Sequence, residues 1–395
     1  MKYKLGQLGT VYSGGTPSTK NGEFWDGDIA WITPKDLAGY SKKKISKGER
    51  NITDAGLSGS SANLIPAGSV LMSSRAPIGY VAIANNELST NQGFKSINCD
   101  ERICLNEYIY YWIKSNIEYI KSKANGSTFK EISGSSFKNL DVDVPDLEAQ
   151  KKTVHILSAL DQKIELNNNE SNTLQSIIDT QYRKVFSENE NNNKVKASDL
   201  FDYEGGYSYT SAELADESDI GMMTIKNFER TGGFKADGFK ALSPKKGTFK
   251  TAALYDIFIS CTDVTQNADI IGNAVMLLDT DKYSTVTYSM DLVRIIPKIN
   301  RFALYAILSS KDFKSFALGY KSGTTVLHLN KKCLAEYEIA LPDEKSLDVF
   351  GATIEKACKK IAINLAENGC LSQIRDSLLP KLMSGDVNLD KVTNE

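Results

Sequence analysis

The stretch from Pro145 to Phe186 is PDLEAQKKTVHILSALDQKIELNNNESNTLQSIIDTQYRKVF, and the rest of the chain is organised around it and its second copy. It contains no Gly, and its only Pro is the first residue. Apolar residues recur along it in alternating steps of three and four once Asn167, Ser171 and Gln181 are included in the series. This heptad pattern predicts a long helix that pairs with another helix. The apolar pairing positions are Leu157, Leu160, Ile164, Leu174, Ile178 and Val185.

A second series with the same spacing lies 197 residues downstream and begins after Pro342. Both series become polar at their middle, at Asn167 and Ser171 in the first and at Asn364 and Asn368 in the second. Matched polar layers fix the alignment of two helices, but they fit a parallel and an antiparallel pair equally well. The apolar pairing positions of the second series are Ile354, Ile361, Leu371, Leu378 and Leu382.

The repeat also includes the residues upstream of each helix. The stretch 126–132 (GSTFKEI) aligns without a gap with 323–329 (GTTVLHL), again at an offset of 197. A repeat of this length indicates a duplicated domain rather than a solenoid. The predicted order is a first globular domain (1–146), a long helix (147–187), a linker with a second globular domain (188–342), and a second long helix with a tail (343–395).

Each globular domain is predicted to be α+β, with strands first and helices at the end. In the first domain we expect strands at 28–34 and 64–72 and one helix over 105–122. The Asn-rich stretch 187–196 (SENENNNKVK) is predicted to be an exposed linker.

Composition sets further limits. Hydrophobic residues make up 41% of the chain, which is enough for the cores of two domains, and no apolar run is long enough to span a membrane. The N-terminus lacks the apolar segment of a signal peptide. The six Cys are scattered and only two His are present, so no metal site is predicted. We therefore expect a cytoplasmic protein with reduced thiols.

The charge pattern leaves two interpretations open. A formal net charge of −2 does not favour a nucleic-acid-binding protein. However, basic residues cluster in both domains, at a comparable distance along the sequence from the start of each domain. They are either solvated loop residues or contacts to DNA phosphates. These clusters are Lys42, Lys43, Lys44, Lys47 and Arg50 in the first domain, and Lys240, Lys245, Lys246 and Lys250 in the second.

Motifs that would indicate covalent chemistry are missing from the sequence. It has no glycine-rich cofactor loop, no Asn/Asp-Pro-Pro-aromatic segment of an adenine methyltransferase, and no zinc protease motif. We therefore predict a protein that is not an enzyme, with no catalytic residue and no cofactor of its own.

The duplicated plan and several short segments resemble the specificity subunit of Type I restriction–modification systems. In the order of that family, the segments are GGTPS (14–18), IAWITPKDL (29–37), SSRAPIGYVAIA (73–84), AQKKTVHILSALDQKIELNN (149–168) and RDSLLPKLMSGD (375–386). The resemblance implies two target recognition domains, each of which reads one half of an asymmetric bipartite DNA site. It also implies that the two helices pair as an antiparallel coiled coil with internal pseudo-two-fold symmetry and set the spacing of the half-sites.

The same resemblance implies partners. Two modification (methyltransferase) subunits, which bind S-adenosylmethionine, dock on the helices, and restriction subunits join the full complex. The length of the helices is compatible with this arrangement, because the series from Leu157 to Val185 spans about 42 Å at 1.5 Å per residue. One turn of DNA is about 34–36 Å, so such a rod can hold two readers over successive major grooves.

Contacts to DNA are predicted to lie on loops, where the alternative for each residue is a turn that satisfies local backbone groups. Arg75 is the strongest candidate, because arginine pairs with guanine through two hydrogen bonds. The first-domain candidates are Thr16, Ser18, Lys20, Lys35, Ser74, Arg75, Asn91, Gln92, Thr128 and Lys130. The second-domain candidates are Lys226, Asn227, Arg230, Thr262, Asp263, Gln266, Lys321, Thr324 and Thr325.

Two functions of other classes remain as alternatives. One is the recognition part of a fused restriction–methylation enzyme, which the missing catalytic motifs disfavour. The other is a coiled-coil assembly scaffold that does not read DNA sequence. Sequence-dependent DNA binding in the presence of a methyltransferase partner distinguishes these from a specificity subunit.

Overall fold

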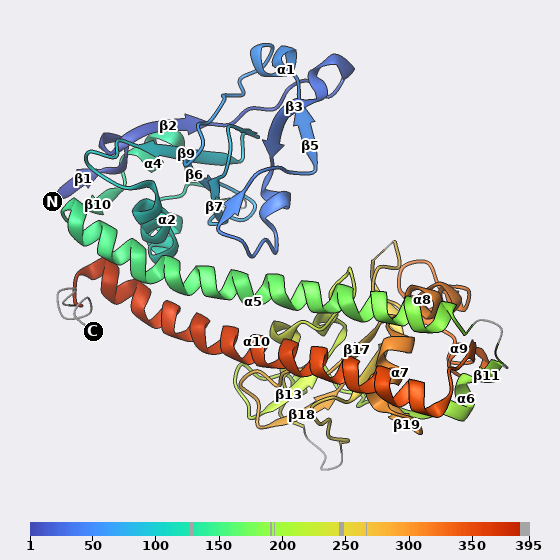
Figure 1. Ribbon diagram of the computed structural model, residues 1–395. Helices are drawn as coiled ribbons and strands as arrows, with labels where there is room; N and C mark the ends of the chain where they lie inside the picture. The colour runs from blue at the N-terminus through green and yellow to red at the C-terminus, as the bar shows by residue number, and fades with distance from the viewer. Residues whose placement is uncertain (127–129, 190–191, 193, 245–248, 266, 388–395) are drawn as a thin grey trace. The chain divides into compact units, whose positions relative to one another are not determined.

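The computed structural model describes residues 1–126, 130–189, 192, 194–244, 249–265 and 267–387 (Figure 1). The chain forms two compact units, Met1–Glu165 with Leu371–Glu395, and Leu166–Cys370. Each unit therefore combines one globular domain with a segment of each long helix. This division differs from the four consecutive segments predicted from the sequence, because each globular domain packs on both helices rather than only on the one that follows it.

The two predicted long helices are confirmed. They are α5 (Leu147–Ser187) and α10 (Glu344–Ser384), both of 41 residues and displaced by 197 positions. Each begins next to an aspartate that accepts a backbone N–H three residues on, at 2.8 Å from Ala149 N to Asp146 Oδ1 and at 3.0 Å from Ser346 N to Asp343 Oδ1. Such side chains satisfy N–H groups that have no partner inside the helix. The duplication therefore extends to the helix start signals.

The first domain contains three sheets, which confirms the mixed α and β content. The five-stranded sheet has the order β2 (Gly9–Ser13), β9 (Phe94–Cys99), β6 (Val70–Ser73), β7 (Val81–Ala84) and β4 (Lys44–Ile45). A three-stranded sheet has the order β5 (Arg50–Ile52), β3 (Trp25–Ile32) and β8 (Ser89–Thr90), and β1 (Lys2–Lys4) pairs with β10 (Asp141–Asp143). The helices are α1 (Asp54–Ser58), α2 (Asn106–Ser115), α3 (Ile117–Ser122) and α4 (Gly134–Lys138).

The second domain repeats this plan with one additional sheet. Its four-stranded sheet has the order β12 (Phe201–Gly205), β19 (Leu292–Pro297), β15 (Ile257–Ser260) and β17 (Ala274–Met276). The smaller sheets are β14 (Lys240–Ala241), β13 (Ile220–Met223) and β18 (Thr285–Tyr288); β16 (Thr262–Asp263), β21 (Leu327–Leu329) and β20 (Lys321–Ser322); and β11 (Lys194–Lys196) with β22 (Glu338–Ala340). The helices are α6 (Ala197–Leu200), α7 (Arg301–Leu308), α8 (Lys311–Leu318) and α9 (Cys333–Glu336).

Short 3-10 helices complete both domains. They are η1 (Leu5–Gln7), η2 (Gly22–Phe24), η3 (Pro34–Leu37), η4 (Ser211–Glu213), η5 (Ile225–Asn227) and η6 (Ala236–Gly238). Among the described residues, no helix is both long and apolar enough to cross a membrane.

Strand register identifies equivalent positions in the two domains. In the first, Lys95 of β9 lies opposite Ser13 of β2 and Met72 of β6. In the second, Val293 of β19 lies opposite Gly205 of β12 and Ile259 of β15. Lys95 and Val293 therefore occupy the same place in the repeated sheet.

Three local predictions need correction. The helix predicted over 105–122 is interrupted at Asn116, whose side chain donates to the Trp112 carbonyl at 2.9 Å and whose backbone (φ −114°, ψ 23°) leaves the helical region. Of the strand predicted at 64–72, only the end forms one: β6 covers Val70–Ser73. The predicted linker ends in β11, because Lys194–Lys196 pairs antiparallel with β22 more than 140 positions away.

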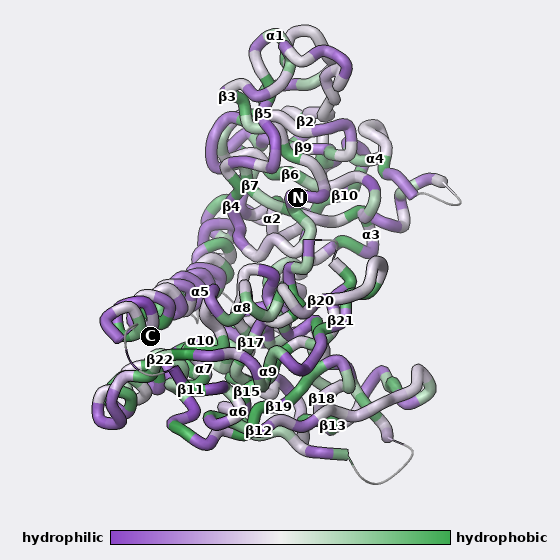
Figure 2. Tube along the Cα trace, turned by 90° about the vertical axis from the view of Figure 1, so that its right-hand side faces the viewer, coloured by the Kyte–Doolittle hydropathy of each residue, from purple (hydrophilic) through white to green (hydrophobic). Residues whose placement is uncertain are grey.

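Each unit packs its domain against the long helices through one hydrophobic core. In the first unit, α2 lies between the five-stranded sheet and the first part of α5 (Figure 1), and Leu157, Leu379 and Leu382 share its core. In the second unit, Ile178 and Ile354 belong to the core of α7 and the four-stranded sheet. All eleven predicted pairing positions are buried or half-buried. Figure 2 shows hydrophilic and hydrophobic residues alternating along both long helices, as expected for helices buried along one side.

Candidate functional site

The first domain brings three candidate loops to one edge of its five-stranded sheet. Strands β2 and β6 end at Ser13 and Ser73, opposite the start of β9. The loops 14–20, 74–79 and 91–93 leave or enter the sheet at this edge. The antiparallel register therefore brings together candidate residues that are far apart in sequence. These are Thr16, Ser18, Lys20, Ser74, Arg75, Asn91 and Gln92.

Two buried tryptophans hold loop 14–20. Trp31 Nε1 donates to the Gly15 carbonyl at 3.0 Å, and Trp25 Nε1 donates to the Ser18 carbonyl at 3.2 Å. A Cβ atom at Gly14 would collide with the backbone oxygens of residues 90 and 91, so this position requires glycine. Trp25 and Trp31 are not among the site residues predicted from the sequence, although their position after the Gly-Gly pair was the available signal.

The candidates Thr16, Ser18, Lys20 and Gln92 are exposed on these loops. Thr16 Oγ1 donates to Gln92 Oε1, which joins two of the loops. Lys35 is 78% exposed but pairs with Glu49 at 2.7 Å. Lys130 is exposed, and Thr128 lies outside the described residues.

Arg75 is held by a weak ion pair. Its Nη1 atom lies 3.4 Å from Glu131 Oε2, and its side chain is 40% exposed. The two residues also form an isolated backbone bridge, which brings the segment around Glu131 to the sheet edge. A half-exposed guanidinium at this distance can exchange its carboxylate for another acceptor.

Two first-domain candidates are less exposed than predicted. Ser74 is fully buried, and its Oγ atom has no hydrogen-bond partner among the described residues. Asn91 is half-buried, and its Oδ1 atom accepts the Gly93 N–H at 2.9 Å, so it shapes the turn. The sequence indicated polar loop residues correctly but could not distinguish those that face solvent.

The second domain has exposed candidates at Lys226, Arg230, Lys321, Thr324 and Thr325. Thr262 is half-buried, and its Oγ1 atom donates to Asp291 Oδ1 at 3.0 Å. Gln266 lies outside the described residues.

Asn227 and Asp263 are wrong as predicted DNA contacts, since both side chains are fully buried. Asn227 accepts the Thr224 N–H and donates to the Lys235 carbonyl, both at 2.9 Å. Asp263 accepts three backbone N–H groups, from Thr265 at 2.7 Å, Ile270 at 2.6 Å and Ile271 at 3.0 Å. Both side chains therefore order the loops from inside.

The predicted basic clusters are partly neutralised within each domain. Lys43 is only 12% exposed and pairs with Glu107 at 3.1 Å. Burial lowers its pKa, against the opposing effect of Glu107. Lys43 also donates to Ser158 Oγ at 2.8 Å, so it joins the sheet to α5 instead of facing a phosphate.

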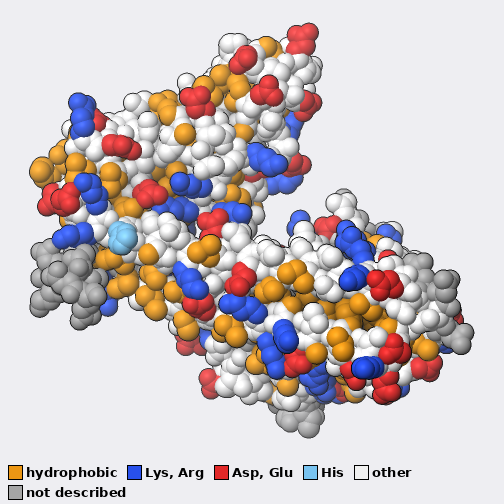
Figure 3. Space-filling view, in the orientation of Figure 1, with side chains coloured by type: hydrophobic (Ala, Val, Ile, Leu, Met, Phe, Trp, Pro, Cys, Tyr) orange, Lys and Arg blue, Asp and Glu red, His pale blue; other side chains and the backbone are white. Residues whose placement is uncertain are grey.

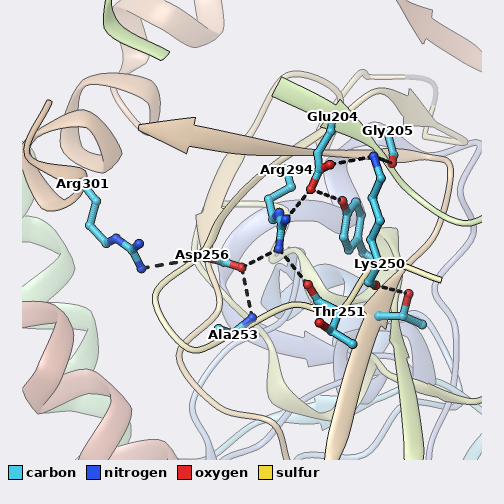
Figure 4. Close-up of polar contacts among 10 residues, drawn as sticks. Glu204, Gly205, Lys250, Thr251, Ala253, Asp256, Arg294 and Arg301 are labelled. Atoms are coloured by element: carbon cyan, nitrogen blue, oxygen red, sulfur yellow. Dashed lines mark hydrogen bonds and ion pairs between the residues drawn. The ribbon is translucent and has the colours of Figure 1, made fainter. Parts of the chain in front are cut away.

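In the second domain, Lys250 belongs to a network of ion pairs (Figure 4). Its Nζ atom lies 2.6 Å from Glu204 Oε2. Arg294 also pairs with Glu204, and its Nη1 atom lies 3.2 Å from Asp256 Oδ2, so it links the two carboxylates. Lys240 donates to the Tyr209 hydroxyl at 3.0 Å, and Lys245 and Lys246 lie outside the described residues. On the face shown in Figure 3, basic and acidic side chains are interspersed over both domains.

Within the described ranges, no group of three or more His, Cys, Asp or Glu side chains is placed to hold a metal ion. The candidate site is thus a set of polar and basic loops, whose exposed members offer hydrogen-bond donors and acceptors. Such groups suit contact with base edges and phosphates.

Comparison with known proteins gives consistent matches over nearly the whole chain. A family model described as the Type I restriction modification DNA specificity domain matches residues 1–176 and, a second time, residues 189–364. The Type I restriction enzyme MjaIX specificity subunit of Methanocaldococcus jannaschii is 30% identical, covering 98% of this chain and 94% of that protein. The HindI specificity subunit of Haemophilus influenzae is 24% identical, covering 94% and 93%.

A solved structure supports the same fold. The crystal structure of the S subunit of a Type I restriction–modification system from M. genitalium has a TM-score of 0.58 at 18% identity, covering 97% of this chain and 95% of that one. The double match of the family model confirms the duplication inferred from the 197-residue offset.

The buried Asp263 carboxylate generates a prediction about stability and pH. Burial raises the pKa of Asp263, but its backbone N–H partners outweigh this effect and hold the pKa below its ordinary value. A carboxyl with a lowered folded-state pKa stabilises the fold above its unfolded-state pKa and loses that effect as pH falls. Asp263→Asn should lower the free energy of unfolding by about 1–3 kcal/mol at neutral pH, because two N–H groups lose their acceptor.

The difference between this variant and the wild type should shrink as pH falls below about 4, measured by urea unfolding at several pH values. Asp237→Asn, at a 75% exposed side chain of the same domain, is the matched control and should have little effect. A pH-independent difference for Asp263→Asn would contradict the role assigned to its charge.

Proposed function

Because the chain belongs to the family of Type I restriction–modification specificity subunits, with two tandem recognition domains, we propose that each domain reads one half of an asymmetric bipartite DNA site. The observation that carries this proposal is a repeated framework with different loop residues. Arg75 and Thr262 both lie two residues beyond the end of equivalent strands, β6 and β15. Two readers with the same scaffold and different contact groups suit two different half-sites.

The exposed loop residues are the groups proposed to contact DNA. Arg75 would donate to guanine, while Lys20, Lys130, Lys226, Arg230 and Lys321 would contact phosphates or bases. The near-neutral charge of the chain and its internal ion pairs favour modest affinity for DNA when the subunit is alone, since nonspecific binding depends on unpaired cations.

DNA binding distinguishes this function from an assembly scaffold. The subunit assembled with its modification subunits should bind duplexes that carry the motif methylated in host DNA at least about 1,000-fold more tightly than unrelated duplexes. Fluorescence anisotropy at fixed salt measures this ratio. Equal affinity for all sequences would favour the scaffold, and adenine methylation by the purified chain alone would favour the fused enzyme.

We infer further that α5 and α10 form an antiparallel coiled coil. Contacts between them support this direction: as the residue number rises along α5, the residue number of its partner on α10 falls. In the first unit, Asp161 pairs with Arg375 at 3.0 Å. In the second unit, Glu170 pairs with Lys360 at 3.2 Å, and the Phe186 ring lies 5.6 Å from the Phe350 ring, at the far end of α5.

Hydrogen bonds at the polar middle support the proposed pseudo-two-fold symmetry. Asn167 Nδ2 donates to Glu367 Oε2 at 2.8 Å, and Asn364 Nδ2 donates to Glu170 Oε2 at 2.9 Å. Each of these bonds becomes the other when the two copies are exchanged by the offset of 197. Asn167 also donates to Asn368 Oδ1 at 2.9 Å, and Asn364 donates to Ser171 Oγ, the equivalent position, at 3.3 Å.

The helix pair is proposed to set the distance between the half-sites. Inserting seven residues, one heptad, after Asn168 and a matching seven after Leu365 keeps the apolar series in phase and lengthens the pair by about 10 Å. The spacer between the half-sites should then grow by about three base pairs at 3.4 Å each, while both half-sites keep their sequence.

Sequencing the DNA methylated by the variant complex measures this spacer. The control is the same seven residues inserted after the exposed Gly39, in a loop of the first domain. If the helix-insertion variant is active and keeps the original spacer, the helices do not set the distance between the half-sites.

The duplicated helices also offer two similar surfaces to identical partners. Leu166 and Ile363, related by the offset, are 65% and 60% exposed, and Ile177 and Ile374, related in the same way, are 42% and 47% exposed. Exposed apolar side chains that recur in pairs support docking of two modification subunits, one per copy. S-adenosylmethionine would be bound by those subunits, and restriction subunits would join the complex that they form.

Docking can be tested at the repeated positions. Leu166→Lys and Ile363→Lys should each weaken the binding of one modification subunit, and the double variant should lose both, because a charge would be buried at each interface. Mass photometry of the assembled complex counts the bound subunits. Val349→Lys is the matched control. Val349 is 64% exposed, but its equivalent position in the first copy is Lys152, so it is not part of an apolar surface that both copies share. Full occupancy of the double variant would exclude these surfaces.

A further inference from the structure

Three charged side chains, Arg75, Lys95 and Glu131, gather at the edge of the five-stranded sheet where loops 14–20, 74–79 and 91–93 meet, here called the reading edge of the first domain. Arg75 and Glu131 form the 3.4 Å ion pair described above. Lys95 enters the same region from β9, and its side chain is directed toward the Glu131–Gly134 segment, since a Cβ atom at Gly134 would lie 3.9 Å from Lys95 Cε. Neither Lys95 nor Glu131 is among the contacts predicted from the sequence.

Lys95 is almost completely buried, with 8% of its surface exposed. Its Nζ atom donates to the Phe94 carbonyl at 3.2 Å, which uses one of its three donors. Burial lowers the pKa of Lys95, the Glu131 carboxylate raises it, and the Arg75 guanidinium lowers it. The three charges therefore act on one another, and a buried ammonium here costs folding free energy unless a carboxylate compensates it.

The second domain has neutral or weakly basic residues at all three equivalent positions. Register in two strand pairs places Val293 where the first domain has Lys95. Thr262 takes the place of Arg75. His328 takes the place of Glu131, because the following residues make matching bonds, Ile132 N to Ser74 O at 3.1 Å and Leu329 N to Cys261 O at 2.9 Å.

The framework itself does not require a lysine at this position. Val293 is fully buried at the equivalent point of the second sheet, so an apolar side chain satisfies the fold there. The three charges occur together in one domain and are replaced together in the other. This pattern indicates a shared task at the first domain's reading edge rather than a general structural role.

We propose that Lys95 is a positioning residue for specificity, which serves as the second cationic partner of Glu131 and so allows Arg75 to turn from Glu131 to a base of the first half-site. The proposal rests on the function proposed above. A guanidinium that makes two hydrogen bonds to guanine cannot keep Glu131 as well. A carboxylate left without a cation beside DNA phosphates would repel the DNA, and Lys95 prevents this.

The central experiment is Lys95→Val in the full chain assembled with its modification subunits. Affinity is measured on duplexes that carry the motif methylated by the wild-type complex and on duplexes altered base by base in each half-site. Binding should weaken about tenfold, because Glu131 then retains Arg75 as its remaining partner in the cluster. Discrimination should fall at the same base positions that Arg75→Ala affects, and the other half-site should be unchanged.

Two controls separate this role from general effects of charge and folding. Lys121→Val removes a half-exposed lysine that pairs with Glu118 at 2.7 Å in the same domain, and it should leave base preference unchanged. The thermal midpoint of Lys95→Val should be no lower than that of the wild type, as Val293 in the second domain suggests. Glu131→Gln, at a half-exposed side chain, gives a second variant that does not depend on core packing.

Glu131→Gln should restore affinity when combined with Lys95→Val, because the competing carboxylate is gone. Unchanged binding and base preference in Lys95→Val, or no rescue by Glu131→Gln, would overturn the role of Lys95. A loss of binding by Glu131→Gln alone as large as that of Arg75→Ala would also overturn it. An Arg75→Ala variant with no effect on either half-site would instead contradict the proposed reading by Arg75.

Discussion

Two buried asparagine side chains constrain how the long helices can lie against each other. Asn167 is 2% exposed and Asn364 is fully buried, and both amides use partners on the opposite helix. An amide buried in an apolar series without a partner costs free energy, so a shift of one helix by a turn would be penalised twice. Asn364 Oδ1 has no partner among the described residues, so the layer favours one alignment at some cost in stability.

The alignment of the two long helices also affects both compact units of the chain. Each domain packs on a segment from both helices, as shown by the core that Leu157 shares with Leu379 and by the core that Ile178 shares with Ile354. The alignment of the helices is therefore coupled to the packing of each domain. A subunit whose task is to present two readers benefits from such coupling, because slippage would disturb both domains.

Periodic features were predictable from the sequence. Both long helices follow from heptad spacing over about forty residues, and their bounds of 147–187 and 344–384 agree closely with the predicted ones. Features that depend on distant partners were not predictable. Strand β11 has three residues and exists because β22 pairs with it. The break in the helix at Asn116 is a different case, because it is local: the Asn116 side chain donates to the Trp112 carbonyl four residues back.

The candidate site shows the same limit at the level of single side chains. Polar residues in loops either face solvent or order the loop from inside, and composition does not distinguish the two. Asp263 and Asn227 bind backbone groups in the interior, whereas Lys226 and Arg230, close by in sequence, are exposed. Lys95 could have been noticed by aligning the two copies, since FKSINC and LVRIIP are equivalent strands, one with lysine and the other with valine at the second position.

The central claim is that two independent readers are held on one helix pair. The most direct test replaces residues 1–146 with the first domain of another family member and sequences the adenines methylated by the resulting complex. The account predicts a motif in which one half and only that half has changed, with the spacer preserved. A change in both halves, or a motif identical to that of the parent protein, would contradict it.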